Sequence, residues 1–432
     1  MSHKADRVAV VLNGNARQVT DELVESFDQL VGSGDLFLSK SLDEAHRVAL
    51  QIVDAGYPVV LTGGGDGTFV QMVTAITKEA RSRSQEPPCF GLLKLGTGNS
   101  LAWALGAGTS REGVFADLAR LRHDSAHRDF RLIEVQGLLT PFAGAGFDAL
   151  GLKHFHDVRS VVRRLPWVGK RATGAVSYAI SIPALTVPKL ALRPRMEVRI
   201  VNRGAAERLD QNGQPVGSRI EKDEVIFEGP CIAALVSTIP YWGFGVRVFP
   251  FADNRPANRF CLRVVATSPL RVAAHMLSVW KGTYRDEKLI DLYAEDVEFE
   301  FDEPNAIEIG GDPAGMTNSM RARLHPDPIK LIARLPDGNQ ENCYLSLSWA
   351  VIIQSYQCWD LGIGSCWGPD ASQLCSSRSG ARQPNRSKDR FGATRASKRV
   401  LTPARRTTTG RSGTERFPSN VTRAITATSL PC

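Results

Sequence analysis

Hydrophobic and polar positions follow two alternating periods in the first part of the chain. Short apolar runs rich in β-branched residues are each followed by a stretch in which apolar residues recur on one helical face. This order of strand and helix predicts a Rossmann-like α/β domain with a parallel sheet over residues 1–128. The predicted strands are Val8–Leu12, Leu36–Leu38, Val59–Leu61 and Phe90–Leu95, and the predicted helices are Val19–Val31, Ala45–Val53, Phe69–Ala80 and one from Leu101.

The pattern changes after residue 128. Short β-branched runs now dominate, and turn residues separate them, which predicts an antiparallel, β-rich sandwich or barrel over residues 129–338. One helical insert is expected from Lys153 to about Leu185. The clearest strand candidates are Met196–Val201, Cys231–Ser237, Cys261–Ala266, Val297–Phe301 and Ile329–Ala333.

The third section, residues 339–432, loses all periodicity after Ile353 and is rich in Ser, Arg, Thr and Gly. Such a composition buries too little apolar area to offset chain entropy, so we expect a disordered tail. The abrupt change is also compatible with a frameshifted or fused reading frame.

Charge is distributed unevenly along the 432 residues. The chain holds 53 basic and 45 acidic residues, and positions 341–432 account for 13 and 5 of them, which leaves 40 of each elsewhere. The whole net charge of +8 therefore lies in the tail. A neutral body predicts no dedicated nucleic-acid binding, and nucleic-acid binding through the basic tail would be steeply dependent on salt.

Targeting features are weak in this sequence. No apolar run approaches the roughly 20 residues that span a bilayer, and the first residues lack the apolar stretch of a secretory signal. The expectation is a cytoplasmic protein whose oligomeric state the sequence leaves open.

A turn with three consecutive glycines joins a predicted strand to a predicted helix in "VVLTGGGDGTFVQMVTAI", residues 59–76. Glycines let backbone N–H groups approach an anion, and the following helix N-terminus attracts it. Asp66 fits such a cradle if a Mg²⁺-nucleotide is the ligand, because carboxylates hold that cation. In the alternative interpretation, this is a tight turn with Asp66 and Thr68 as helix caps.

A second glycine turn follows the next strand, in "GLLKLGTGNSLAWALG", residues 91–106. Two such turns at the carboxyl ends of parallel strands face one crevice, where open α/β sheets bind ligands. Neither turn has the Walker or the G-x-G-x-x-G spacing. The pair therefore predicts a phosphate site of another kind.

Together these segments resemble the catalytic domain of the diacylglycerol kinases, a family that includes bacterial lipid kinases, sphingosine kinases and ceramide kinases. Gly64–Thr68 and Leu95–Asn99 match its two glycine turns, and Asn13 takes the place of an asparagine after the first strand. "GAGFDA" at 144–149 and "IGGDPAG" at 309–315 are similar to two later segments. The resemblance covers roughly residues 7 to 335 and excludes the tail.

The resemblance implies a kinase that uses ATP and Mg²⁺ to phosphorylate a lipid hydroxyl, with Asp66 directed toward the metal and Asp312 as the base. The lipid would be diacylglycerol-like or sphingoid, and would be met by peripheral association with the inner face of a membrane. The nucleotide-binding residues would be Asn13, Gly64, Gly65, Asp66, Gly67, Thr68, Gly96, Thr97, Gly98 and Asn99.

Several positions depart from the family pattern. The usual Asp-Gly-Glu triplet is Gly310-Gly311-Asp312, so the preceding acid is missing and the base is one methylene shorter. Asp312 is alternatively a turn residue before proline. Lys94 replaces a usual proline and adds charge near the phosphates, and Ser100 replaces a common aspartate.

Two further features have two interpretations each. Asp148 either contacts the nucleotide or the metal, or caps a helix that begins at Ala149. The segment Lys153–Arg171 interleaves basic and aromatic residues, which suits either a membrane surface or an ordinary solvated helix.

Two other functions compete with the lipid kinase. An NAD kinase-like enzyme shares the first turn but not the second in this form. A degenerate kinase fold would bind nucleotide without turnover, as the missing acid suggests.

Overall fold

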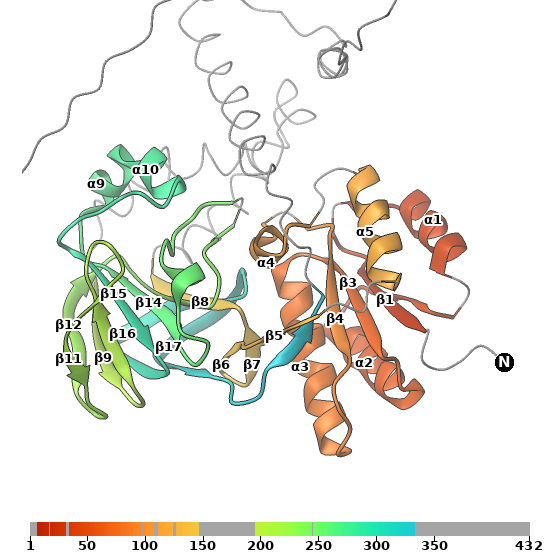
Figure 1. Ribbon diagram of the computed structural model, residues 1–432, viewed down its shortest axis with the longest axis horizontal. Helices are drawn as coiled ribbons and strands as arrows, with labels where there is room; N and C mark the ends of the chain where they lie inside the picture. The colour runs from red at the N-terminus through yellow and green to blue at the C-terminus, as the bar shows by residue number, and fades with distance from the viewer. Residues whose placement is uncertain are drawn as a thin grey trace, which may run out of the picture. The chain divides into compact units, whose positions relative to one another are not determined.

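The computed structural model of the chain describes residues 7–16, 18–31, 34–96, 98–107, 111–123, 127–146, 195–243 and 245–332. Within these ranges the strands form a six-stranded and a twelve-stranded sheet (Figure 1). The predicted insert from Lys153, with its basic and aromatic residues, lies outside the described residues. The same holds for Asp148 and for the predicted tail at 339–432.

The first sheet has the strand order β2-β1-β3-β4-β18-β5. Every neighbouring pair is parallel except β18 with β5. The prediction of a parallel α/β sheet is therefore confirmed. The strands are β1 (Val8–Asn13), β2 (Leu36–Ser39), β3 (Val59–Gly64), β4 (Cys89–Lys94), β5 (Arg128–Phe130) and β18 (Ile329–Leu331).

Helices cover both faces of this sheet (Figure 1). Along β1, Ala9 and Val11 belong to the same buried cluster as residues of α2 and α3, whereas Val8, Val10 and Leu12 pack with residues of α1 and α5. This alternation has the period of two that a strand imposes on its side chains. The helices are α1 (Asp21–Val31), α2 (Leu42–Ala55), α3 (Asp66–Ser82), α4 (Ser100–Ala104) and α5 (Arg111–His123).

The second sheet contains only antiparallel pairs. Its main path is β11-β10-β15-β14-β13-β8-β16-β17-β6-β7, and β9 joins β16 to β12. The prediction of a strand-rich antiparallel second domain is confirmed. The strands are β6 (Ile133–Val135), β7 (Leu138–Thr140), β8 (Phe142–Gly146), β9 (Met196–Asn202), β10 (Ala206–Leu209), β11 (Pro215–Ile220), β12 (Val225–Cys231), β13 (Ala233–Ser237), β14 (Phe260–Val265), β15 (Leu289–Ala294), β16 (Asp296–Ile309) and β17 (Asp312–Leu324).

Strand β18 corrects one prediction. The run Ile329–Ala333 was assigned from the sequence to the antiparallel part, but β18 lies in the first sheet between β4 and β5. Leu331 pairs with Phe90 on one side and with Arg128 on the other. The local pattern identified the strand correctly and was silent about its partner, because pairing over more than 200 residues leaves no local signal.

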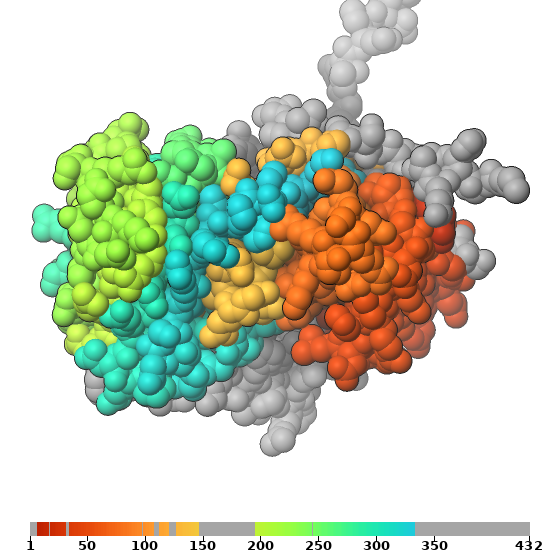
Figure 2. Space-filling model, turned by 90° about the horizontal axis from the view of Figure 1, so that it is seen from below, coloured from red at the N-terminus to blue at the C-terminus, as the bar shows by residue number. Residues whose placement is uncertain are grey.

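Helix α3 connects the two sheets. Its Phe69 and Ile76 share one continuous buried cluster with residues of β8, β13, β14 and β16. The Thr74 hydroxyl accepts a hydrogen bond of 2.8 Å from the Leu139 N–H on β7. Figure 2 shows residues 127–146, in yellow, between the orange-red residues of the first sheet and the green and cyan residues of the second. The same helix also begins at the first glycine turn, which sets the site beside this junction.

Candidate active site

The first glycine turn is built so that α3 begins without any side-chain cap. Strand β3 ends at Gly64, Gly65 is the N-cap residue in an extended conformation, and no side chain bonds to the helix start there. A Cβ at Gly64 would overlap the Thr68 side chain, so the turn requires glycine at that position. The start of a 17-residue helix faces this turn, and helix N-termini favour anionic ligands.

The two glycine turns touch each other. A Cβ at Gly96 would lie 2.5 Å from the Gly65 nitrogen, and even closer to the Gly65 Cα. This approach requires glycine at position 96, whereas a Cβ at Gly65 would lie 3.8 Å from the Gly96 Cα, an ordinary contact distance. Gly65 and Gly96 are therefore in van der Waals contact, which brings the two turns together. That both turns face one ligand crevice stays a prediction.

Asp66 joins the turns through hydrogen bonds. Its Oδ2 accepts from the Ser100 N–H at 2.6 Å, and its Oδ1 accepts from the Leu101 N–H at 2.9 Å. These are the first two backbone donors of α4, so Asp66 stands at the start of α3 but caps α4. The capping alternative thus holds for Asp66, which caps α4 rather than the helix that it begins.

Burial dominates the electrostatics of Asp66. Loss of solvent raises the pKa of this carboxyl to about 6, the two backbone hydrogen bonds lower it, and the charge of Asp312 raises it further. A buried carboxylate that faces a second carboxylate is poised to accept a cation. Its assignment as a metal ligand remains a prediction.

Two asparagines hold the turns in shape. The Asn13 Nδ2 donates to the Thr68 hydroxyl at 2.9 Å, and its Oδ1 accepts from the Asn15 N–H at 2.9 Å. Asn99 has a left-handed backbone, and its side chain bonds to both the N–H and the carbonyl of Gly96. Both asparagines therefore order the glycine turns. Thr97 lies outside the described residues.

Asp312 reaches the site from the second sheet. It follows a two-residue turn at the end of the β16–β17 hairpin, in which Ile309 pairs with Asp312 and both Gly310 and Gly311 have positive φ. A Cβ at Gly67 would overlap the Asp312 carboxylate. The residue predicted as the base thus lies against the first turn of α3, beside Asp66.

Gly310, where the family carries an acid, has no room for one. Its φ is +60°, and a Cβ built there would lie 2.5 Å from Val70 Cγ2 and 3.2 Å from Thr140 Oγ1. The acid of the family pattern is therefore replaced by a tight glycine turn, and this turn packs on α3.

Lys94 occupies the edge of the site. Its ammonium lies 3.8 Å from the centroid of the Trp103 ring on α4, and its strand position pairs with Gly64. Burial lowers the pKa of Lys94 to about 8, and the charge of Asp66 opposes that shift. The sequence predicted that Lys94 adds charge near the phosphates. In the structure its ammonium makes a cation–π contact with Trp103.

Sequence reasoning missed one participant, the loop at Trp242–Gly245. The Gly243 N–H donates to the Ser100 hydroxyl at 2.6 Å, and Gly243 Cα would lie 3.9 Å from a Cβ at Gly98. Gly243 and Gly245 both have positive φ. A glycine pair in "YWGFG" was the available signal, but nothing local connected it with a turn 140 residues earlier.

Within the described ranges, no group of three or more His, Cys, Asp or Glu side chains forms a metal cluster. None of the helices described is long and apolar enough to cross a membrane.

Comparison with known proteins identifies the first domain. Residues 7–128 match the model of the diacylglycerol kinase catalytic domain. No curated protein matches the chain.

Two solved structures of a candidate diacylglycerol kinase from Bacillus anthracis str. Sterne align with TM-scores of 0.52, at 16% and 15% identity, over 76% of this chain and 97% of theirs. At these identities the likeness shows the fold. An NAD kinase from Archaeoglobus fulgidus in complex with ATP aligns with a TM-score of 0.36 and 11% identity, over 75% of this chain and 92% of its own, which is too weak to bear on function.

The matched domain covers β1 to α5 and contains both glycine turns, and the two-sheet fold of the B. anthracis protein extends over the rest of the described chain. Residues 7–128 therefore match a diacylglycerol kinase catalytic domain, and the likeness to the B. anthracis structures shows that the described chain shares their fold.

Proposed function

We propose that this chain is an ATP- and magnesium-dependent lipid kinase that transfers the γ-phosphate to a hydroxyl of a diacylglycerol-like or sphingoid lipid. The observation that carries the proposal is the contact between Asp312 and Gly67. It sets a carboxylate of the antiparallel sheet against a glycine turn of the parallel sheet. Phosphoryl transfer needs a donor and an acceptor side by side, and a junction of this kind supports that arrangement.

The nucleotide phosphates would lie along the two glycine turns. Gly65 and Gly96 present bare backbone, and the start of α3 favours negative charge. Asn13 and Thr68 support the first turn, and Asn99 supports the second. Their contribution would be to hold the phosphates in one orientation, since phosphoryl transfer depends mainly on positioning and on neutralised charge.

The residues at the junction fit a magnesium ion. Asp66 and Asp312 are neighbouring carboxylates, and phosphates bound at the same place would add further negative charge. Carboxylate and phosphate oxygens are the ligands that Mg²⁺ takes in nucleotide sites. Asp66 would hold the magnesium ion, with Asp312 as the neighbouring carboxylate. Bound magnesium would neutralise charge on the transferred phosphoryl group.

Asp312 would act on the acceptor. A carboxylate within hydrogen-bonding reach of the lipid hydroxyl accepts its proton as the new P–O bond forms. Its place at the end of a two-residue turn between paired strands fixes the position of its backbone. The shorter side chain, compared with glutamate, is offset by direct packing against α3.

The acceptor class implies where the protein works. A lipid hydroxyl is reached at a bilayer surface, so the proposal includes transient, peripheral association with the inner face of a membrane from the cytoplasm.

The test is a phosphate-transfer assay with γ-labelled ATP and Mg²⁺. A panel of mixed-micelle lipids would be offered beside NAD, with the native chain, Asp312→Asn and Asp66→Asn. Asp302→Asn is the matched control, because Asp302 is an exposed aspartate on the neighbouring strand β16. We expect label in one lipid class, a loss of about a hundredfold or more in Asp312→Asn, and native rates in the control.

The other outcomes separate the alternatives. Label in NAD would make the chain an NAD kinase-like enzyme. ATP binding without label in any acceptor would make it a degenerate kinase fold, a reading that the glycine turn at Gly310 favours. Native rates in Asp312→Asn would overturn the role of Asp312 while leaving the kinase activity in place.

A further inference from the structure

The connection between β14 and β15 contains two short helices, α9 (Pro269–Ala274) and α10 (Met276–Trp280), at one end of the antiparallel sheet (Figure 1). They are rich in apolar residues but bury almost none of them. Pro269 is the one buried residue of α9, and α10 has none. By contrast, α3 buries eight of its residues. The apolar residues of the pair are Pro269, Leu270, Val272, Ala273, Ala274, Met276, Leu277, Val279 and Trp280.

Two leucines stand out on this surface. Leu270 is 62% exposed and Leu277 is 54% exposed, although each is large and apolar. Exposed leucines occur singly on most proteins. Here the two lie seven residues apart, and Pro269 alone is buried among the apolar residues of the two helices, so the surface forms a contiguous stretch of chain.

The helices are held in place by polar contacts rather than by a core. The Ser268 hydroxyl caps α9 by accepting from the Arg271 N–H at 3.2 Å. The Asp286 carboxylate accepts from Tyr284 at 2.9 Å and from Thr267 at 3.1 Å, and pairs with Arg271 at 3.3 Å. These contacts give an ordered support that presents apolar side chains outward.

Basic residues accompany the leucines. Arg271, Lys281 and Lys288 are exposed, and Glu287 is the exposed acid of the same segment. The carboxylate of Asp286 is turned inward by its three partners. Residues 267–289 hold four basic side chains, Arg271, Lys281, Arg285 and Lys288, against the two acidic ones, Asp286 and Glu287, so the segment offers apolar side chains next to an excess of positive charge.

We propose that the α9–α10 surface, defined by Leu270, Arg271, Leu277, Lys281 and Lys288, is the docking surface for a bilayer that contains anionic lipid. Leucines that enter the acyl boundary gain free energy by leaving water, and the basic side chains meet lipid phosphates. Half-buried Trp280 suits the interface between the two zones. The proposal rests on the proposed lipid kinase function and adds the surface through which the substrate is reached.

The experiment is vesicle sedimentation with the full chain, using phosphatidylcholine vesicles with and without phosphatidylglycerol. The variant is Leu270→Ser with Leu277→Ser. Its matched control is Leu30→Ser with Leu42→Ser, because those leucines of α1 and α2 are 50% and 68% exposed. A third variant, Lys281→Gln with Lys288→Gln, tests the charge.

We expect the leucine variant to bind both kinds of vesicle about tenfold more weakly, with no change in the control. The lysine variant should lose binding only where phosphatidylglycerol is present. Circular dichroism and ATP binding of the same samples report whether each variant is folded.

Three results would overturn the proposal: native vesicle binding in the leucine variant, an equal loss in the control, or a changed oligomeric mass that marks the surface as an interface between copies. Failure of the proposed function looks different. If the leucine variant loses vesicle binding but no lipid accepts label in mixed micelles, the surface stands and the lipid kinase function falls. If a lipid accepts label but the leucine variant binds vesicles as the native protein does, the lipid kinase function stands and the proposed surface falls.

Discussion

Asp66 is the residue on which both glycine turns depend, since its carboxylate bonds to the start of α4 while its backbone begins α3. Its burial has a measurable consequence. The pKa of Asp66 is raised from 3.8 to about 6 in the folded protein, so the folded state binds more protons than the unfolded chain between those values. Stability that depends on this group is therefore present at low pH and decreases as pH rises through this window.

We expect the free energy of unfolding to carry a contribution from Asp66 that falls by up to about 3 kcal/mol between pH 4 and pH 6. Urea denaturation of native protein and of Asp66→Asn across this range measures it, because the asparagine does not titrate. The difference between the two proteins should change with pH. A pH-independent difference for Asp66→Asn would contradict the raised pKa.

Lys94 leads to a second pH-dependent prediction, this time for a positively charged side chain. Its ammonium makes a cation–π contact with the Trp103 ring near Asp66, and burial lowers its pKa to about 8. The positive charge is present below that pH and is lost as pH rises through it. We therefore expect Lys94→Met to weaken ATP binding about tenfold at pH 7, as expected for one lost charge near phosphates. Titration calorimetry with ATP measures this effect.

The controls for Lys94 separate charge from packing. Lys94→Arg keeps its charge at pH 9, where the native lysine has lost most of its own, so its ATP affinity should change less between pH 7 and pH 9. Adenosine lacks phosphates, so its affinity should be the same in native protein and in Lys94→Met. An equal loss for adenosine and ATP would assign Lys94 a purely structural role.

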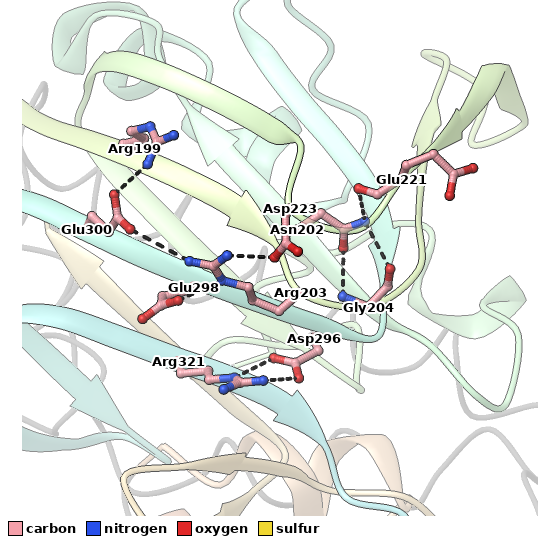
Figure 3. A network of polar contacts seen from close by, with 10 residues as sticks. All are labelled: Arg199, Asn202, Arg203, Gly204, Glu221, Asp223, Asp296, Glu298, Glu300 and Arg321. Carbon is pink, nitrogen blue, oxygen red and sulfur yellow. Dashed lines mark hydrogen bonds and ion pairs between the residues drawn. The ribbon is translucent and has the colours of Figure 1, made fainter.

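At the scale of elements, strands β9, β16 and β17 of the antiparallel sheet carry a polar network around Asn202 and Arg203 (Figure 3). The two residues are neighbours in sequence but differ in burial. Asn202 is fully buried and its Nδ2 donates to the carbonyls of Gly204, Ile220 and Glu221. Arg203 is partly exposed and pairs with Asp223 and Glu298, each at 2.7 Å.

We expect Asn202→Ala to lower the free energy of unfolding by about 2–3 kcal/mol, because it removes a fully buried amide together with its hydrogen bonds to three backbone carbonyls. Arg203→Gln, one residue away, should cost about 1 kcal/mol or less, since partly exposed ion pairs are screened by solvent. Urea denaturation at two salt concentrations compares them directly. Added salt should reduce the effect of the Arg203 change and leave that of Asn202 intact; equal costs would contradict the assignment by burial.

Local patterns predicted the elements of the first domain well and their long-range contacts poorly. The sequence Ser41-Leu-Asp-Glu44 has the capping-box pattern, and the Ser41 hydroxyl accepts a hydrogen bond from the Glu44 N–H at the start of α2. The pairing of Asp66 with α4, 34 residues later, has no local signal. The same is true of the bond between Gly243 and Ser100.

The family resemblance supplied what periodicity could not. It singled out Asn13, Asp66 and Asp312 from distant parts of the chain, and the structure brings them to one junction. It did not predict that Gly310 would be sterically closed to an acid, since that depends on Val70 packing beneath a left-handed turn. The physical reason for such a departure from a family pattern is visible only in the three-dimensional structure.

For the whole molecule, strand β18 decides how the chain is tied together. The polypeptide leaves the first sheet after β5, builds the antiparallel sheet, and returns to place β18 between β4 and β5. Ile329, Leu331 and Ile332 are each less than 5% exposed, and they belong to the buried clusters on both faces of the first sheet. The α/β domain is therefore completed by residues roughly 200 positions downstream of β5, its last preceding strand.

This connection predicts that truncation after residue 338 keeps a folded kinase, whereas truncation after residue 326 does not. Loss of three buried apolar side chains removes about 5 kcal/mol or more, comparable with the entire stability of a domain. In the full chain, Leu331→Ala should lower the free energy of unfolding by about 2–4 kcal/mol. Lys330→Ala, one residue away and exposed, should have no comparable effect. Thermal denaturation would measure the stability of the two variants, and ATP binding would show which truncated proteins are folded. If Leu331→Ala unfolded at the native temperature, the first domain would be stable without its returning strand, and the two sheets would be separable units rather than one interlocked fold.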